Sequence, residues 1–98
     1  MILHNMITKQ PLISIHKHTR GSQLFFNKSA LDLIDAKEIC IFYTNEGIII
    51  KKPILDSKHT TKIYSSTCYF KSGDNDDLNG KYEIYRKDED TFLLTKLN

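Results

Sequence analysis

The chain has 98 residues, 40% of them hydrophobic and 27% charged, with a formal net charge of +2, which is the balance of one small globular domain. No apolar run approaches the length of about 18 residues that a membrane-spanning helix needs, and the N-terminal residues do not have the pattern of a secretory signal. Cys40 and Cys68 stand alone and far apart, so we expect reduced thiols and a cytoplasmic location in a host cell.

The first predicted elements are two strands, a turn and a helix. Alternation of apolar and polar residues predicts a strand over residues 12–17, a turn over 18–21, and a second strand up to Phe26. Asn27 and Ser29 both offer N-cap oxygens for a single short helix near residues 28–36. The order strand, turn, strand, helix is therefore expected for this part of the chain.

The middle of the chain predicts a β-hairpin. Residues 37–43 become a continuous apolar strand, and the glycine of the turn over residues 45–47 can adopt a positive φ. The return strand over 47–52 contains three consecutive isoleucines, which favours burial on both faces. Pro53 is expected to end this strand, because proline cannot donate a hydrogen bond to the next one.

The second half is also predicted to be β-structure. It contains an expected strand over 61–71, a polar loop over 72–80, an alternating strand over 81–87, a charged turn over 88–90 and a last strand over 91–97. The fold class predicted for the whole chain is mainly β (α+β). About seven short antiparallel strands and one short helix would form a small barrel or sandwich.

Charge is distributed unevenly along the chain. Residues 1–31 contain four Lys and Arg residues and no acidic residue, giving +4, whereas residues 63–98 contain five cations and seven acids, giving −2. The basic N-terminal part can neutralise phosphates, and the acidic part can repel or imitate them. Scattering of these charges over all faces of the domain is the alternative.

His16 and His18 are the best candidates for a metal site, but they do not complete one. Two residues apart on a strand, they share a face, and paired imidazoles can chelate zinc. None of the other soft candidates, His4, His59, Cys40 and Cys68, comes with a close partner at ligand spacing. We therefore expect no metal, and a solvent-facing strand end whose histidines gain charge as the pH falls.

The loop before the strand at 81–87 resembles the start of a calcium loop, with oxygen-bearing residues at the first, third and fifth positions and Gly80 at the sixth. The twelfth position, which requires a glutamate, is Arg86. An Asn79-Gly80 turn between two strands explains the same residues.

Catalytic motifs are lacking as well. The sequence contains no nucleophile elbow, phosphate-binding loop or dinucleotide-binding motif. Pairs of carboxylates, such as Asp32 with Asp35, fall at positions expected to be exposed, without an apolar pocket around them. We therefore expect neither an enzyme nor a cofactor.

Aromatic residues recur on the predicted strands, where they either fill the core or stack on nucleic-acid bases beside cations. The candidates for stacking are Phe25 or Phe26 beside Arg20 and Lys28, and Tyr85 beside Arg86 and Lys87.

A set of segments within residues 12–53 follows a recognisable order of strands, helix and hairpin: Arg20-Gly21, Leu24-Phe25-Phe26-Asn27, Ala30-Leu31, Leu33, Glu38-Ile39, Ile41, Tyr43 and Glu46-Gly47-Ile48-Ile49-Ile50-Lys51-Lys52. In this pattern, residues 12–53 resemble the AbrB-like, or swapped-hairpin, family of transcription-factor domains. The sequence departs from the family at Asn27, where a proline is usual, and after the helix, where Leu33-Ile34 and Lys37-Glu38 replace glycine-containing pairs. The resemblance implies an intertwined homodimer that contacts DNA through Lys17, Arg20 and Lys28. Residues 61–97 would then be a β extension of this unit within a single domain, 1–98.

Two functions are predicted, in addition to the plain alternative of a structural module within a larger assembly. The first is a non-enzymatic nucleic-acid-binding protein, such as a regulator of a phage or mobile element, whose basic N-terminal hairpin contacts the phosphates of DNA or RNA. Its candidate residues are His16, Lys17, His18, Arg20 and Lys28. The second is a phage anti-defence inhibitor of the anti-CRISPR kind, which binds a host nuclease or its guide RNA in a protein–nucleic-acid complex. Its candidate partner-binding residues are Asp74, Asp76, Asp77, Tyr85 and Arg86.

Overall fold

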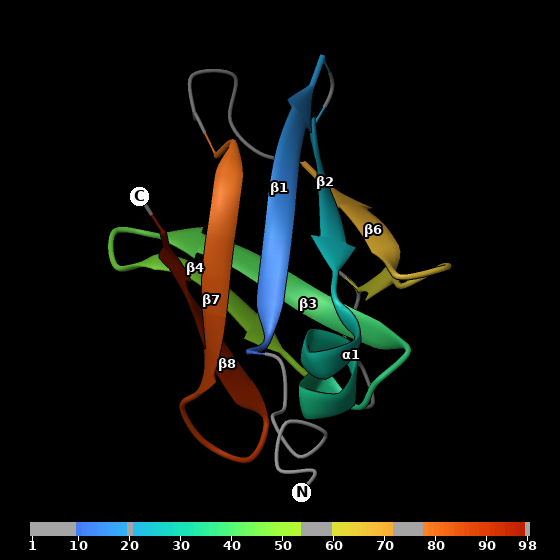
Figure 1. Ribbon diagram of the computed structural model, residues 1–98, viewed down its shortest axis with the longest axis vertical. Helices are drawn as coiled ribbons and strands as arrows, with labels where there is room; N and C mark the ends of the chain where they lie inside the picture. Colours follow the sequence, from blue (N-terminus) through green and yellow to red (C-terminus); the bar gives the residue numbers. More distant parts are fainter. Residues whose placement is uncertain (1–9, 20, 54–59, 72–77, 98) are drawn as a thin grey trace, which may run out of the picture.

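The core of the domain is enclosed by strands that follow one another around a nearly closed barrel (Figure 1). The computed structural model describes residues 10–19, 21–53, 60–71 and 78–97. Within these ranges the elements are β1 (Leu12–His18), β2 (Gly21–Phe26), α1 (Lys28–Ile34), β3 (Glu38–Thr44), β4 (Gly47–Lys51), β5 (Thr61–Lys62), β6 (Thr67–Phe70), β7 (Gly80–Arg86) and β8 (Thr91–Lys96). The prediction of a mainly β fold with one short helix is confirmed. None of the helices described is long and apolar enough to cross a membrane.

The described strands form one antiparallel sheet in the order β5-β3-β4-β8-β7-β1-β2-β6. The two strands at the ends of this order, β5 and β6, are consecutive in the chain. Between them, the backbones of Tyr64 and Thr67 exchange two hydrogen bonds of 2.8 and 2.9 Å across a two-residue turn. The chain itself therefore joins the two ends of the sheet.

This turn corrects the prediction of one strand over residues 61–71. Ser65 and Ser66 both adopt positive φ angles, 48° and 69°, as the central residues of a tight hairpin of the primed type do. Glycine or asparagine usually occupies these positions, and because neither is present here, the sequence carries no signal for a turn. The structure accordingly has eight described strands where about seven were expected.

The interior follows from the alternation of side chains along each strand. Ile13 and Ile15 of β1 are almost fully buried, and so are Tyr82 and Ile84 on neighbouring β7. The buried cluster as a whole consists of Ile13, Ile15, Leu24, Phe26, Ala30, Ile34, Ile39, Ile48, Ile50, Cys68, Leu78, Tyr82, Ile84, Phe92 and Leu94. Burial on both faces of β4 is not found to the extent predicted, because Ile49 lies on the outer surface and is only partly buried.

The helix α1 lies at one end of the barrel, beside the ends of β1 and β2 (Figure 1). Asn27 is its N-cap, as predicted, and the Asn27 side chain accepts a hydrogen bond of 2.8 Å from the backbone N–H of Ala30. The helix ends at Ile34, two residues before the predicted limit of 36, because Asp35 takes the left-handed conformation. Ala30 and Ile34 are the helical residues that contribute to the buried core.

Candidate nucleic-acid interface

The outer surface of three adjacent strands, β1, β2 and β6, carries the predicted histidines. Because Ile13 and Ile15 point into the core, His16 and His18 point outward, and both are exposed. Phe25 also points outward, with 38% of its surface exposed, whereas Phe26 is a core residue at 5%. Of the two phenylalanines considered for stacking, the structure therefore leaves only Phe25 accessible.

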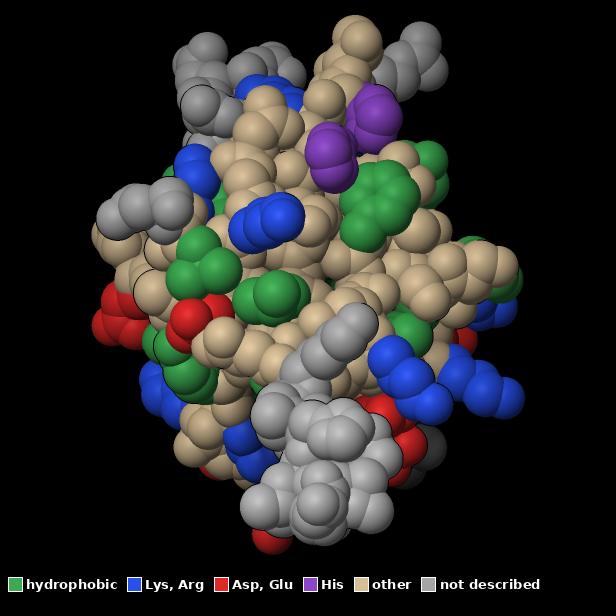
Figure 2. Space-filling view, in the orientation of Figure 1, with side chains coloured by type: hydrophobic (Ala, Val, Ile, Leu, Met, Phe, Trp, Pro, Cys, Tyr) green, Lys and Arg blue, Asp and Glu red, His purple; other side chains and the backbone are tan. Residues whose placement is uncertain are grey.

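Four rings lie in two contacting pairs on this surface. The ring centroids of His16 and Phe25 are 5.1 Å apart in an edge-to-face arrangement, and those of His18 and Tyr69 are 6.2 Å apart with a tilt of 46°. We call the surface formed by His16, His18, Gln23, Phe25 and Tyr69 the ring face. Figure 2 shows the two described histidines (purple) next to hydrophobic side chains (green) on the near side of the barrel.

Gln23 connects the two ring pairs. It lies opposite His16 on β1 and opposite Tyr69 on β6 in the strand register. The Nε2 atom of His18 donates a hydrogen bond of 3.1 Å to the Oε1 atom of Gln23. The side chain of His18 is thus held beside Tyr69, which has 59% of its surface exposed.

The ring face is bordered by cations. No described residue of β1, β2 or β6 is acidic. Lys71 directly follows β6, and Lys81 on β7 lies opposite Ser14 of β1 in the register; both lysines are exposed. This combination of flat rings and positive charge is suited to bases and phosphates.

A surface pocket of about 370 Å³ opens at the edge of the ring face. It is lined by His18, Gly21, Thr61, Tyr69, Phe70 and Lys71. Gly21 has no side chain, so its backbone lines the pocket directly. A Cβ atom at this position would come within 2.6 Å of the carbonyl oxygen of Phe70. The pocket shares His18 and Tyr69 with the ring face.

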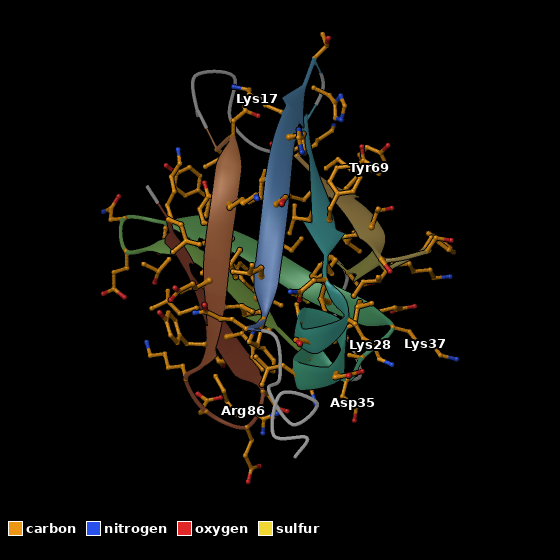
Figure 3. All side chains as sticks on the ribbon, in the orientation of Figure 1. Lys17, Lys28, Asp35, Lys37, Tyr69 and Arg86 are labelled. Carbon is orange, nitrogen blue, oxygen red and sulfur yellow. The ribbon has the colours of Figure 1, made fainter. Side chains whose placement is uncertain are left out.

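The predicted basic residues do not all lie near this surface. Lys17 is half-buried at one end of the barrel, where its backbone N–H donates a hydrogen bond of 2.6 Å to Oδ1 of Asn79. Figure 3 shows Lys28, the exposed first residue of α1, toward the opposite end. Arg20 lies outside the described residues. Lys17 and Lys28 therefore lie toward different ends of the barrel and do not form one basic cluster.

The predicted partner-binding residues also differ from one another. Tyr85 is 48% exposed on β7, and its hydroxyl donates a hydrogen bond to Glu83. Arg86 instead donates a hydrogen bond of 3.1 Å to the carbonyl oxygen of Leu33 and lies 5.5 Å from the centre of the Phe92 ring. Asp74, Asp76 and Asp77 lie outside the described residues.

In the described part of the chain, no three His, Cys, Asp or Glu side chains are close enough to hold a metal ion together. Cys40 and Cys68 are both buried, and neither is part of a disulfide. Burial raises the pKa of Cys68 to about 12, so its nucleophilic thiolate form is disfavoured.

Sequence reasoning missed Gln23, Thr61, Tyr69, Lys71 and Lys81. The outward orientation of Tyr69 follows from alternation with Cys68, but only once β6 is known to begin at Thr67. Its position beside His18 depends on the pairing of β2 with β6, for which the sequence carries no local signal.

Comparison of the chain with protein-family models, with curated proteins and with solved structures finds no match in any of the three.

Proposed function

We propose that this protein is a small, non-enzymatic nucleic-acid-binding protein, and that the ring face is its contact surface. The observation that supports the proposal is the presence of four outward-facing rings on three adjacent strands without an acidic residue among them. Stacking of a base on an aromatic side chain contributes about 1–3 kcal/mol. His16, His18, Phe25 and Tyr69 would supply this stacking.

Phosphate contacts would come from the cations at the border of the ring face. Lys71 and Lys81 join the predicted Lys17 in this role. Lysine contacts with phosphates release counterions, so the affinity should fall as salt rises. Lys28 serves as an internal comparison, because it lies toward the other end of the barrel.

Fluorescence anisotropy with labelled oligonucleotides tests the proposal. We expect Lys81→Glu to weaken binding and to reduce its salt dependence between about 50 and 200 mM, and Lys28→Glu to have a smaller effect. A double variant that carries both His16→Ala and His18→Ala should also lower the affinity, measured at constant salt. If the wild-type protein binds neither DNA nor RNA at the lowest salt, the proposed function is wrong.

A second candidate function is binding to a protein partner, as in an anti-defence inhibitor. The observation in its favour is an apolar row on the outer surface of β3, β4, β8 and β7, where Phe42 pairs with Ile49, Ile49 with Leu93, and Leu93 with Tyr85. Phe42 and Tyr85 are 45% and 48% exposed. Contiguous exposed apolar surface on a small protein marks interaction sites.

A pull-down from host lysate, with and without nuclease, separates the two functions. A stoichiometric protein partner that survives nuclease and is lost with Phe42→Ser would favour the inhibitor. A signal that nuclease abolishes and that Phe42→Ser leaves unchanged would favour the nucleic-acid-binding protein.

A further inference from the structure

We infer that the nucleic acid bound at the ring face is single-stranded and that the adjoining pocket accepts one unstacked base. This inference rests on the proposed function and specifies its substrate class. It follows from the shape of the pocket, the orientation of its rings and the positions of the neighbouring polar groups.

The pocket has the size for one small ring system. At about 370 Å³ it lies near the lower limit of the pockets that bind small molecules, which span about 300–1,000 Å³. Gly21 leaves one wall without a side chain, and its close approach to Phe70 prevents even an alanine from occupying this position without displacement of the backbone. A flat base can therefore lie against the backbone at this wall.

The rings of Tyr69 and His18 that line the pocket are accessible for stacking and are not buried in the core. Tyr69 is 59% exposed, and His18 is fixed beside it by the hydrogen bond to Gln23. A base that enters the pocket would stack on Tyr69 and lie near the hydroxyl group of Thr61. Lys71, exposed at the same pocket, can contact the phosphate attached to that base.

The next nucleotide of the bound strand would contact the ring face beside the pocket. Tyr69 pairs with Gln23, and Phe25 is two residues farther along β2, so Tyr69 and Phe25 are diagonal neighbours on one surface. Such neighbours are separated by about 7–8 Å. Successive unstacked bases of a single strand can thus occupy Tyr69 and Phe25, with His16 in edge-to-face contact with the Phe25 ring.

Duplex nucleic acid cannot use these groups in the same way. Its bases are paired and stacked, so the faces that would meet Tyr69 and Phe25 are covered, and exposing one base costs a few kcal/mol. Phosphate contacts to Lys71 and Lys81 remain available to a duplex. We therefore expect duplexes to bind through charge alone.

The experiment compares the full chain on labelled single-stranded DNA, single-stranded RNA and duplex DNA of about 12 nucleotides, at one salt concentration, by fluorescence anisotropy. We expect a single strand to bind at least about tenfold more tightly than the duplex. Tyr69→Ala should lower single-strand affinity about tenfold and duplex affinity less than about twofold, while Tyr69→Phe should retain wild-type binding. Tyr43→Ala, which removes a tyrosine of similar exposure (50%, against 59% for Tyr69) from β3, is the matched control.

A second measurement reports on the environment of one base in the strand. The fluorescent base 2-aminopurine, placed within the single strand, should change in intensity on binding to the wild-type protein and not to Tyr69→Ala. Circular dichroism of each variant confirms that it is folded. Duplex binding as tight as single-strand binding, or single-strand binding unchanged by Tyr69→Ala, would overturn this inference and leave the proposed function intact. Failure to bind any of the three nucleic acids would instead overturn the proposed function.

Discussion

The Nη2 atom of Arg86 donates a hydrogen bond of 3.1 Å to the carbonyl oxygen of Leu33, which joins the end of β7 to the last turn of α1. The guanidinium group also lies over the buried ring of Phe92, 5.5 Å from its centre. Arg86 therefore has a structural role that its exposed position alone would not indicate. Both contacts are made by the same planar group, which a lysine could not reproduce.

We predict that Arg86→Met lowers the free energy of unfolding by about 1–2 kcal/mol, because it removes a charged hydrogen bond and a cation–π contact. Chemical denaturation with urea measures the difference. Lys87→Met, at the next and also exposed position, is the control and should change stability by less than about 0.5 kcal/mol. If both variants are equally stable and Arg86→Met alone loses a protein partner, Arg86 is a binding residue as the sequence predicted.

The side chain of Asn27 connects the start of α1 to the start of β1 through hydrogen bonds. Its Oδ1 atom accepts hydrogen bonds from the backbone N–H groups of Ala30 at 2.8 Å and Leu12 at 3.1 Å, and its Nδ2 atom donates one of 2.8 Å to the carbonyl oxygen of Gln10. We predict that Asn27→Ala costs about 2 kcal/mol of stability, because it removes a helix cap and a strand-end hydrogen bond together.

Asn27→Asp separates these contributions. An aspartate keeps both hydrogen bonds to Oδ1 and loses the donor to Gln10, so the expected loss is below about 1 kcal/mol. Thermal and urea unfolding of the two variants give the comparison. Equal losses for alanine and aspartate would mean that the cap contributes nothing and that the amide donor is the important group.

The local parts of this fold could be predicted from the sequence, because they depend on residues close together in the chain. Alternation over residues 81–87 places Tyr82 and Ile84 on the same face of a strand, and the structure buries both; the N-cap at Asn27 follows from the polar residue before an apolar helix. The hidden turn at Ser65 and Ser66 could not be predicted, since these residues adopt positive φ angles without a glycine to signal them.

Only the part of the candidate site that lies on one strand could be predicted from the sequence, because the rest depends on which strands pair. His16 and His18 were identified from their spacing on one strand, and their exposure agrees with that assignment. Tyr69 is 51 positions beyond His18 and reaches it only through the register of β6 on β2. Lys28 shows the reverse limitation, because it is close to Lys17 in the sequence but lies toward the other end of the barrel (Figure 3). The number of charges in a stretch of sequence does not show how far apart the charged residues are in the folded chain.

Tyr82 and Tyr85 make a matched pair of hydroxyl groups on β7. The buried Tyr82 hydroxyl donates a hydrogen bond of 2.7 Å to the carbonyl oxygen of Leu78, whereas the exposed Tyr85 hydroxyl donates to Glu83. We predict that Tyr82→Phe lowers stability by about 1–3 kcal/mol, because the buried carbonyl loses its partner, and that Tyr85→Phe changes it by less than about 0.5 kcal/mol. Urea unfolding at neutral pH measures both, and a similar cost for the two variants would contradict the burial argument.

Cys68 should make the domain sensitive to alkaline pH. Its side chain is 2% exposed, and burial raises the pKa of the thiol from 9.0 to about 12. Below pH 9 the thiol is neutral in both the folded and the unfolded chain, so the shift costs no stability there. Above pH 9 the unfolded chain releases the proton and the folded chain retains it, so the free energy of unfolding falls as the pH rises.

The expected loss is about 1.4 kcal/mol per pH unit above pH 9, approaching about 4 kcal/mol near pH 12, relative to a variant without this thiol. Urea unfolding of wild type and Cys68→Ala from about pH 7 to 10.5, under reducing conditions, measures it. Lysine and tyrosine side chains titrate in both proteins, so their effects cancel in the difference. Cys40→Ala retains Cys68 and should follow the wild-type slope. A constant difference between wild type and Cys68→Ala across this range would mean that the thiol ionises as freely in the folded chain as in the unfolded one.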